Sequence, residues 1–297
     1  MKKIFLSLSI VTLFVIMGNS QHRYLYNHYI VNPVLINPGA SGFDYKHNLF
    51  LDYRNTWANQ PGSPKTFTFS YDGNVAENIG LGAQIMSDRY SELETFKGQL
   101  SYSYILQGEQ YRFGLGFTTE YTDYHVVGGL TGGIIDRNDP YLAIRQDGDR
   151  FFDLAFGAHG VIQDKFLLSV TLPQLLHTKL NSREGEVEQD KIFNYVLGLG
   201  YIFESQEYAL KVVPSLYVKK LGYFNTLIDA NLLFSFSDDK FTSGLSYELG
   251  DEGTFGFLIG TKFGNFNLYY SYDFAFKEFQ TYNNGSHELT LGYRIGK

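Results

Sequence analysis

Hydrophobic and polar residues alternate one by one through most of the chain after residue 47. Between residues 266 and 276, every second residue is Phe, Leu or Tyr, whereas the residues between them include Asn267, Ser271 and Asp273. A period of two places successive side chains on opposite faces of a β-strand. The pattern therefore predicts strands that have one apolar, aromatic face and one polar face.

Fourteen strands of this kind can be placed, near the length of about 9–11 residues that a tilted membrane strand requires. They cover residues 48–54, 65–71, 79–87, 95–106, 110–121, 150–160, 165–172, 191–203, 208–218, 225–236, 241–249, 254–263, 266–276 and 287–296. A soluble sandwich uses strands of about 5–6 residues. The lengths and the two-sided pattern predict an all-β fold, a transmembrane antiparallel up-and-down β-barrel of about 14 strands.

The connections between these strands alternate in length. On one side they are short, as at residues 107–109 and 264–265, with residues 72–78 as the one longer exception. The other side carries long connections, of which 122–149 and 173–190 are the longest. Outer-membrane barrels have short periplasmic turns and long outer loops, so an even strand number predicts that both termini are periplasmic.

The first 47 residues lack this alternation and divide into two parts. Residues 1–20 have two lysines, an apolar stretch and small residues before Gln21, which predicts a signal peptide rather than an uncleaved anchor. In residues 21–47, Pro33 and Pro38 disfavour both helix and central strand. The tyrosines of this part predict a plug on or inside a barrel of residues 48–297, and a disordered leader is the alternative.

Composition narrows the chemistry. The chain has no cysteine and a net charge of −7, which excludes disulfides and thiolate sites and argues against a nucleic-acid partner. Its seven histidines show no metal-ligand spacing, and no Ser–His pair shares a strand face. The glycine-rich residues 128–133 lack the Lys-Ser/Thr ending of a phosphate loop. We therefore predict no catalytic residue, no metal site and no cofactor.

Charged residues fall on the polar face of the predicted strands. They either form a charge network in the lumen of the barrel or are present only because a polar lumen tolerates charges of both signs. The candidates are Asp52, Arg54, Lys97, Arg112, Glu120, Asp153, Asp229, Asp273, Glu288 and Arg294. Their mixed signs argue against a strongly ion-selective pore. Trp57, the only Trp, is either an interface residue of the barrel or a contact for the plug or a partner.

Four short motifs follow the predicted signal peptide in a fixed order: Asn37-Pro38-Gly39-Ala40-x-Gly42, Tyr53-Arg54-x-x-Trp57, Gly62-x-Pro64-x-Thr66 and Gly80-Leu81-Gly82. The order and spacing of these motifs resemble those of the PorP/SprF family, which comprises outer-membrane barrels of the Bacteroidota type IX secretion and gliding apparatus. A further match lies at residues 168–176. The chain has Gly39 and Thr56 where the family more often has Ala and Gln, and its end lacks the usual terminal aromatic residue.

The resemblance implies a non-enzymatic outer-membrane protein. It would act as a partner for the secretion or surface anchoring of a large adhesin, or as a bridge to the periplasmic ring lipoprotein, with outer-membrane lipid around it. The candidate plug or partner contacts are Asn37, Pro38, Arg54, Trp57, Pro64 and Pro173, together with the loops 122–149 and 173–190. The alternative is a FadL-like outer-membrane transporter of hydrophobic small molecules, with an N-terminal hatch.

Overall fold

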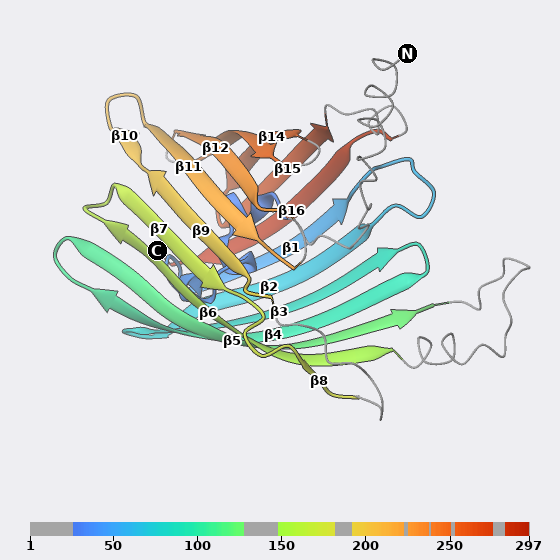
Figure 1. Cartoon of the computed structure of the whole chain (residues 1–297). Coiled ribbons are helices and arrows are strands. Elements are labelled where there is room, and N and C mark those ends of the chain that lie inside the picture. Colours follow the sequence, from blue (N-terminus) through green and yellow to red (C-terminus); the bar gives the residue numbers. More distant parts are fainter. Residues whose placement is uncertain are drawn as a thin grey trace, which may run out of the picture.

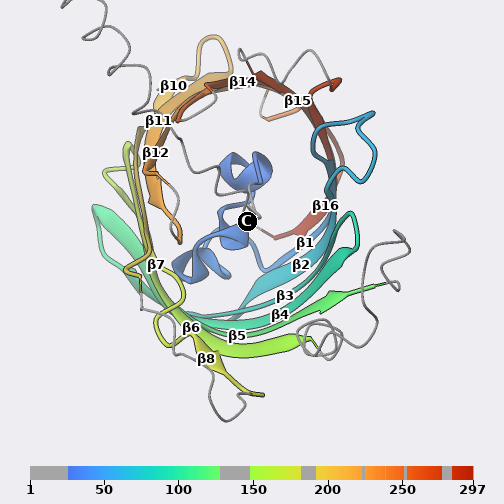
Figure 2. The same ribbon diagram turned by 45° about the vertical axis from the view of Figure 1, so that its right-hand side comes forward.

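The computed structural model describes residues 26–127, 148–181, 192–222, 225–237, 239–250, 253–275 and 283–296. The predicted signal peptide lies outside these residues, as does most of the two longest loops. The described chain is an antiparallel β-barrel that closes where β1 pairs with β16, from His47 opposite Ile295 to Asn55 opposite His287 (Figures 1 and 2). Within the described ranges, no helix is both long enough and apolar enough to cross a membrane.

Fourteen strands form the wall, because β9 and β10 are two parts of one strand along β11, and β8 only adds a short pairing to β6. The strands are β1 (His47–Asn55), β2 (Lys65–Ala76), β3 (Ile79–Tyr90), β4 (Leu93–Gln107), β5 (Tyr111–Val126), β6 (Asp149–Ile162), β7 (Phe166–Leu172), β8 (Thr178–Lys179), β9 (Tyr195–Tyr201), β10 (Phe203–Ser205), β11 (Leu210–Lys220), β12 (Leu227–Phe236), β13 (Phe241–Leu249), β14 (Thr254–Phe263), β15 (Phe266–Ala275) and β16 (Ser286–Ile295). The fold prediction is confirmed, and each predicted strand corresponds to one strand of the wall.

Two boundaries differ from the prediction in an informative way. The connection expected over residues 72–78 is wrong, because β2 continues to Ala76 and leaves only Glu77 and Asn78 before β3. A register shift between Asn74 and Ala76 absorbs one residue, and such a bulge is invisible to a strict alternation rule. β5 also continues to Val126, into the loop expected to begin at residue 122.

The two ends of the barrel differ in their connections. Lys46 donates its backbone N–H to Gly296, so both ends of the barrel chain lie at one rim, which we call the terminal end. Every connection at this end is a short turn, whereas the opposite rim, the loop end, carries the connections after β1, β5 and β7. The long connections all lie at one end, as the sequence predicted, but the alternation is not strict, because only Ser91 and Glu92 separate β3 from β4 at the loop end.

The wall has an apolar outer face and a polar inner face. Outward-facing Phe67 and Leu100 have exposed fractions of 50% and 66%, whereas Thr68 and Asp52 on the inner face are 1% and 2% exposed. An outer face of this kind suits lipid, because exposing so much contiguous apolar surface to water is unfavourable.

The N-terminal segment, residues 26–46, lies inside the barrel (Figure 2, blue). It forms three single-turn 3-10 helices, η2 (His28–Ile30), η3 (Pro33–Leu35) and η4 (Pro38–Ala40). Pro33 and Pro38 each stand in the first turn, where the missing N–H of proline leaves no bond unmade. The Asn37 side chain accepts from the N–H of Gly39 and caps η4.

Candidate functional site

Asn37 connects the N-terminal segment to the wall. Its Nδ2 donates to the Ala158 carbonyl at 2.9 Å and to Ser169 Oγ at 2.8 Å, and its Oδ1 accepts from Gly39 N–H at 2.8 Å. Asn37 is fully buried, so these bonds replace those that water would make. The side chain therefore fixes η4 against β6 and β7.

Glycines on β5 and β6 form the floor under η4. A Cβ on Gly114 would collide with the Gly39 carbonyl, and a Cβ on Gly116 would lie 2.5 Å from the Pro38 carbonyl carbon. Gly157 faces the Asn37 side chain in the same way. Glycine in a strand often marks the close approach of another backbone, and here that backbone belongs to the N-terminal segment.

The next residues dock on β2, β3 and β4. Ser103 donates through Oγ to the Ser41 carbonyl at 2.5 Å, and Gly42 donates its N–H to Asp72 Oδ2 at 2.9 Å. A Cβ on Gly80 would collide with the same Ser41 carbonyl. Gly42 has a φ of +63°, a conformation that favours glycine. The Gly80-Leu81-Gly82 motif is thus a docking surface for this segment.

The other end of the N-terminal segment binds charged residues of β1, β15 and β16. Arg54 donates to Glu288 Oε2 at 2.5 Å and to Asp273 Oδ2 at 2.9 Å. The same Glu288 carboxylate accepts the backbone N–H groups of Asn27, at 2.8 Å, and His28, at 3.1 Å. Charge-assisted bonds of this kind are the stronger ones. Glu288 therefore connects the wall to the segment.

His28 projects into this charged group and is fully buried. Its Nδ1 lies 2.5 Å from Thr290 Oγ1, which donates to Asp52, and 3.5 Å from Asp52 Oδ2. Burial by itself lowers the pKa of the His28 imidazole, but the neighbouring carboxylates of Glu288 and Asp52 more than offset this and raise the pKa above its usual value.

A second polar group, on β11 and β12, holds Tyr29. Its hydroxyl donates to Asp229 Oδ2 at 2.8 Å and accepts from Asn231 Nδ2 at 3.0 Å. Lys219 Nζ lies 2.5 Å from the same carboxylate and 5.4 Å from the centre of the Tyr29 ring. Burial and the Asp229 charge raise the pKa of Tyr29 well above its usual value, so the hydroxyl remains a donor.

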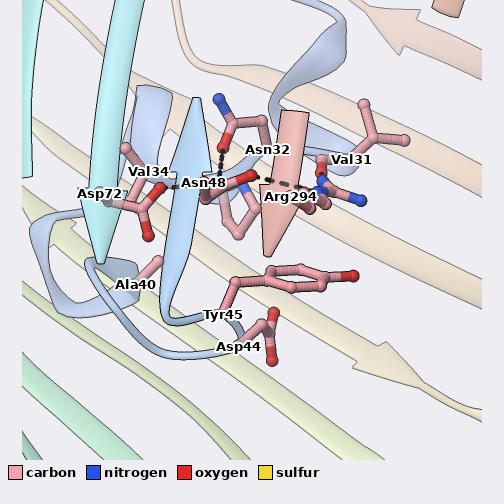
Figure 3. A pocket seen from close by; sticks show the side chains of 10 residues that line it. Val31, Asn32, Val34, Ala40, Asp44, Tyr45, Asn48, Asp72 and Arg294 are labelled. Carbon is pink, nitrogen blue, oxygen red and sulfur yellow. Dashed lines mark hydrogen bonds between the residues drawn. The ribbon is translucent and has the colours of Figure 1, made fainter. Parts of the chain in front are cut away.

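Arg294 binds the segment near the terminal end. Its Nη2 donates to the Val31 carbonyl at 2.6 Å and its Nε to Asn48 Oδ1 at 3.1 Å, while Tyr45 packs 4.8 Å from the guanidinium (Figure 3). These residues and Asp72 surround a small polar pocket between the segment and the wall. The contacts from Glu288 to Arg294 show that the segment runs through the lumen to the terminal end.

The remaining predicted charges lie on the inner face at other places. Lys97 pairs with Glu120 at 2.9 Å, and Arg112 lies 4.5 Å from the centre of the Phe43 ring. Asp153 accepts the N–H of Leu176 at 3.0 Å, in the connection after β7. The structure therefore brings Asp52, Arg54, Asp273 and Glu288 together around His28, and it places Arg112, Glu120, Asp153, Asp229 and Arg294 in separate groups.

Three of the predicted plug or partner contacts lie outside the lumen, at the loop end of the barrel. Trp57 follows β1 with a φ of +54°, donates its N–H to Ser286 Oγ at 3.2 Å, and meets the Tyr90 ring edge-on at 6.3 Å. Pro64 is a buried residue of the same loop, and its carbonyl accepts from Thr56 N–H at 2.9 Å. Pro173 follows the end of β7 directly. These three residues thus lie at the loop end, away from η4.

Sequence reasoning did not identify His28, Lys219 or Thr290 as functional candidates, because nothing in the local sequence distinguishes them. Tyr29 was among the tyrosines expected to pack on or inside the barrel, but its partner Asp229 is distant in the chain and was not foreseen. The glycine floor had a usable signal: Gly114 and Gly116 share one face of a strand whose alternate positions are apolar.

A closed wall with a lipid-suited face and a polar interior defines an outer-membrane β-barrel. The family model described as "Type IX secretion system membrane protein PorP/SprF" matches residues 18–293. The chain belongs to the PorP/SprF family of type IX secretion membrane proteins, as the motifs indicated, and its location is the outer membrane. No curated protein matches it.

Solved structures with a similar fold are barrels of low sequence identity. The outer-membrane protein Omp33 of Acinetobacter baumannii has a TM-score of 0.52 at 9% identity, covering 86% of this chain and 100% of that one. The toluene transporter TbuX of Ralstonia pickettii has a TM-score of 0.53 at 10% identity, covering 88% and 92%. A mutant of the monoaromatic hydrocarbon channel TodX has a TM-score of 0.53 at 10% identity, covering 92% and 95%. These similarities concern the fold alone.

Proposed function

We propose that this protein is a binding component of the type IX secretion system that acts as a partner for the secretion or surface anchoring of a large adhesin. A bridge to the periplasmic ring lipoprotein is the second version of the same role. Membership of the PorP/SprF family is the observation that carries the proposal. The role is one of binding and not of catalysis.

The state of the lumen supports a binding role. The N-terminal segment crosses the interior and is bonded to β16 through Glu288, to β12 through Asp229 and to β7 through Ser169. The buried charges of the wall are thus used to hold the chain's own residues. A partner then meets the two rims of the barrel, and the loop end offers the larger connections.

We propose the loop around Trp57 and the connection after Pro173 as contacts with that partner. The loop is held rigidly, since Ala58 exchanges backbone hydrogen bonds with residues 284 and 285, at 2.8 and 2.7 Å. Beyond Pro173, Leu175 and Leu176 have exposed fractions of 42% and 37%. Exposed apolar side chains on a fixed rim suit protein binding.

A pull-down in mild detergent tests the proposal. The tagged protein is purified from its native outer membrane and the co-eluting proteins are identified by mass spectrometry. A very large repetitive adhesin supports the first version, and the ring lipoprotein supports the second. Elution of the barrel without any secretion component contradicts both.

The second candidate function is transport of hydrophobic small molecules. The observation that favours it is the fold similarity to barrels whose names describe a toluene transporter and a hydrocarbon channel. It requires an apolar binding site next to the N-terminal segment, whereas the small pocket described above has Asp72, Asn48 and Arg294 in its lining beside apolar residues such as Val31 and Val34. In the same pull-down, a barrel that elutes alone with a bound lipid or fatty acid supports transport.

A further inference from the structure

A compact group of potential metal ligands lies between the N-terminal segment and the strands that close the barrel. His28, Asp52 and Glu288 each offer one ligand atom, and these atoms all lie within 4.8 Å of one another. The three residues are buried, with exposed fractions of 0%, 2% and 0%. We propose that this group binds one divalent cation of the zinc class, which fastens the N-terminal segment to the β1–β16 seam.

The distances suit such an ion. His28 Nδ1 lies 3.5 Å from Asp52 Oδ2 and 3.6 Å from Glu288 Oε1. Zinc binds nitrogen and oxygen ligands at about 2.0–2.2 Å in tetrahedral geometry, which separates the ligand atoms by about 3.4 Å. The two distances from His28 are close to that separation, and all three ligand atoms lie within 4.8 Å of one another. The Thr290 hydroxyl donates to Asp52 and so orients this carboxylate, and His28 Nδ1, which lies 2.5 Å from the same hydroxyl, would exchange that hydrogen bond for the ion.

The charges of the group also favour a dication. Asp52, Asp273 and Glu288 carry three carboxylates, and within the described part of the chain the only lysine or arginine that forms a salt bridge with them is Arg54. Buried charge without compensation is strongly unfavourable. A bound dication would offset the two excess negative charges of the group.

Unpaired oxygen atoms give an independent indication. Asp52 Oδ1 and Asp273 Oδ1 are buried and have no hydrogen-bond partner among the described residues. Buried carboxylate oxygens are normally bonded, so each such atom requires an explanation. The other oxygen of the Asp52 carboxylate, Oδ2, faces His28. If both oxygens of Asp52 coordinated the ion, Oδ1 would have a partner. Asp273 lies outside the proposed ligand set and is held by Arg54, which also binds Glu288, so the indication comes from Asp52 Oδ1 alone.

The donor set selects the type of cation. An imidazole nitrogen suits zinc and its transition-metal neighbours, whereas calcium and magnesium prefer sites made only of oxygen. The ligands come from η2, β1 and β16, which are separated by 24 and 236 positions in the chain. This separation explains why the spacing of histidines alone predicted no metal site.

Zinc titration of the full mature barrel in detergent tests the proposal. The protein is first stripped with EDTA, and zinc is then titrated by calorimetry, with calcium as the comparison ion. We expect one zinc ion per chain, weaker binding of calcium, and a loss of affinity of at least about tenfold in His28→Ala. His177→Ala is the matched control, because His177 pairs with Asp153 at 3.5 Å in the connection after β7. It should bind zinc as the wild type does.

A structural readout accompanies the titration. Zinc should protect the N-terminal segment of the wild type from limited proteolysis, and EDTA should remove that protection. The proposal is overturned if the wild type does not bind one zinc ion per chain. It is also overturned if His28→Ala binds zinc as tightly as the wild type does. If His28→Ala fails to insert, Asp52→Asn serves as the second variant, and unchanged affinity in that variant also overturns the site.

Discussion

Arg54 Nη1 lies 2.5 Å from Glu288 Oε2, and the two residues are direct neighbours across the strand pair that closes the barrel. The carboxylate of Glu288 also accepts two backbone N–H groups of the N-terminal segment. Closure of the wall and docking of the segment therefore share one side chain. Removing either member of this pair should affect both.

Arg54→Ala is expected to destabilise the folded barrel by about 3–5 kcal/mol, because it leaves the buried Glu288 and Asp273 without their cation. The measurement is urea unfolding in detergent, followed by heat-modifiable migration. Arg89→Ala is the control, since Arg89 is 57% exposed and pairs with Glu94 at 3.4 Å. That exposed pair should contribute less than about 1 kcal/mol. Equal effects of the two variants would refute the structural role of Arg54.

Gly116→Ala should displace the N-terminal segment while the wall still forms. The added Cβ would lie 2.5 Å from the Pro38 carbonyl carbon and 2.8 Å from Gly39 N, both backbone atoms that cannot move aside easily. Limited proteolysis of the segment is the measurement. In Gly98→Ala the new Cβ would meet only Phe96, at 3.9 Å, so this variant should leave the cleavage rate unchanged. A protected segment in Gly116→Ala would contradict the docking surface.

Asn37→Ala removes donors to Ser169 and Ala158 and the cap of η4. The buried acceptors then lose their partner, which is unfavourable by about 1–3 kcal/mol. We expect faster proteolysis of the segment, with a smaller effect on unfolding of the wall. Asn265→Ala, in the exposed turn between β14 and β15, is the control and should behave as the wild type does.

Tyr29→Phe keeps the packing of the ring against Tyr217, 4.9 Å away, and removes only the hydroxyl. Asp229 and Asn231 each lose one hydrogen bond in a buried place. The expected loss of stability is about 1–3 kcal/mol in urea unfolding. Tyr208→Phe, at a position 71% exposed, should change stability by no more than about 0.5 kcal/mol. If both substitutions are neutral, the Tyr29 hydroxyl contributes nothing to docking.

Trp57→Ala separates the two roles that the sequence left open for this residue. If the loop is a partner contact, the variant should insert normally and retain heat-modifiable folding, yet recover less partner in the pull-down. Loss of folding would instead assign Trp57 to the wall, where it meets Tyr90. Pro64→Ala, in the same loop, tests whether loop shape alone produces the effect.

The sequence predicted the wall better than the interior. Alternation from Phe266 to Asp273 identifies a strand and its lumenal face without any tertiary information, because the period follows from backbone geometry. The charged inner-face residues could be placed for the same reason. Their partners could not, since contacts such as His28 with Glu288 or Tyr29 with Asp229 depend on the path of an irregular segment through the lumen.

The glycine motifs show what the sequence alone could not explain. Gly80-Leu81-Gly82 was a recognisable motif, but the docked Ser41 carbonyl, together with the Ser103 side chain of β4, explains why position 80 admits no side chain. Sequence spacing marks a position as special, and the physical reason appears only when the second backbone is present. The bulge between Asn74 and Ala76 is a similar case, since it shortens a connection without changing the composition.

The most direct test of the account is an engineered disulfide between the N-terminal segment and the wall. The chain has no cysteine, and a Cβ at Gly82 would lie 3.5 Å from the Ser41 Cβ, within the range of disulfides. We predict that Ser41→Cys with Gly82→Cys forms an intramolecular disulfide in native outer membranes. Ser41→Cys with Gly98→Cys should form none. Absence of the first disulfide in a correctly inserted barrel would contradict an N-terminal segment docked in the lumen.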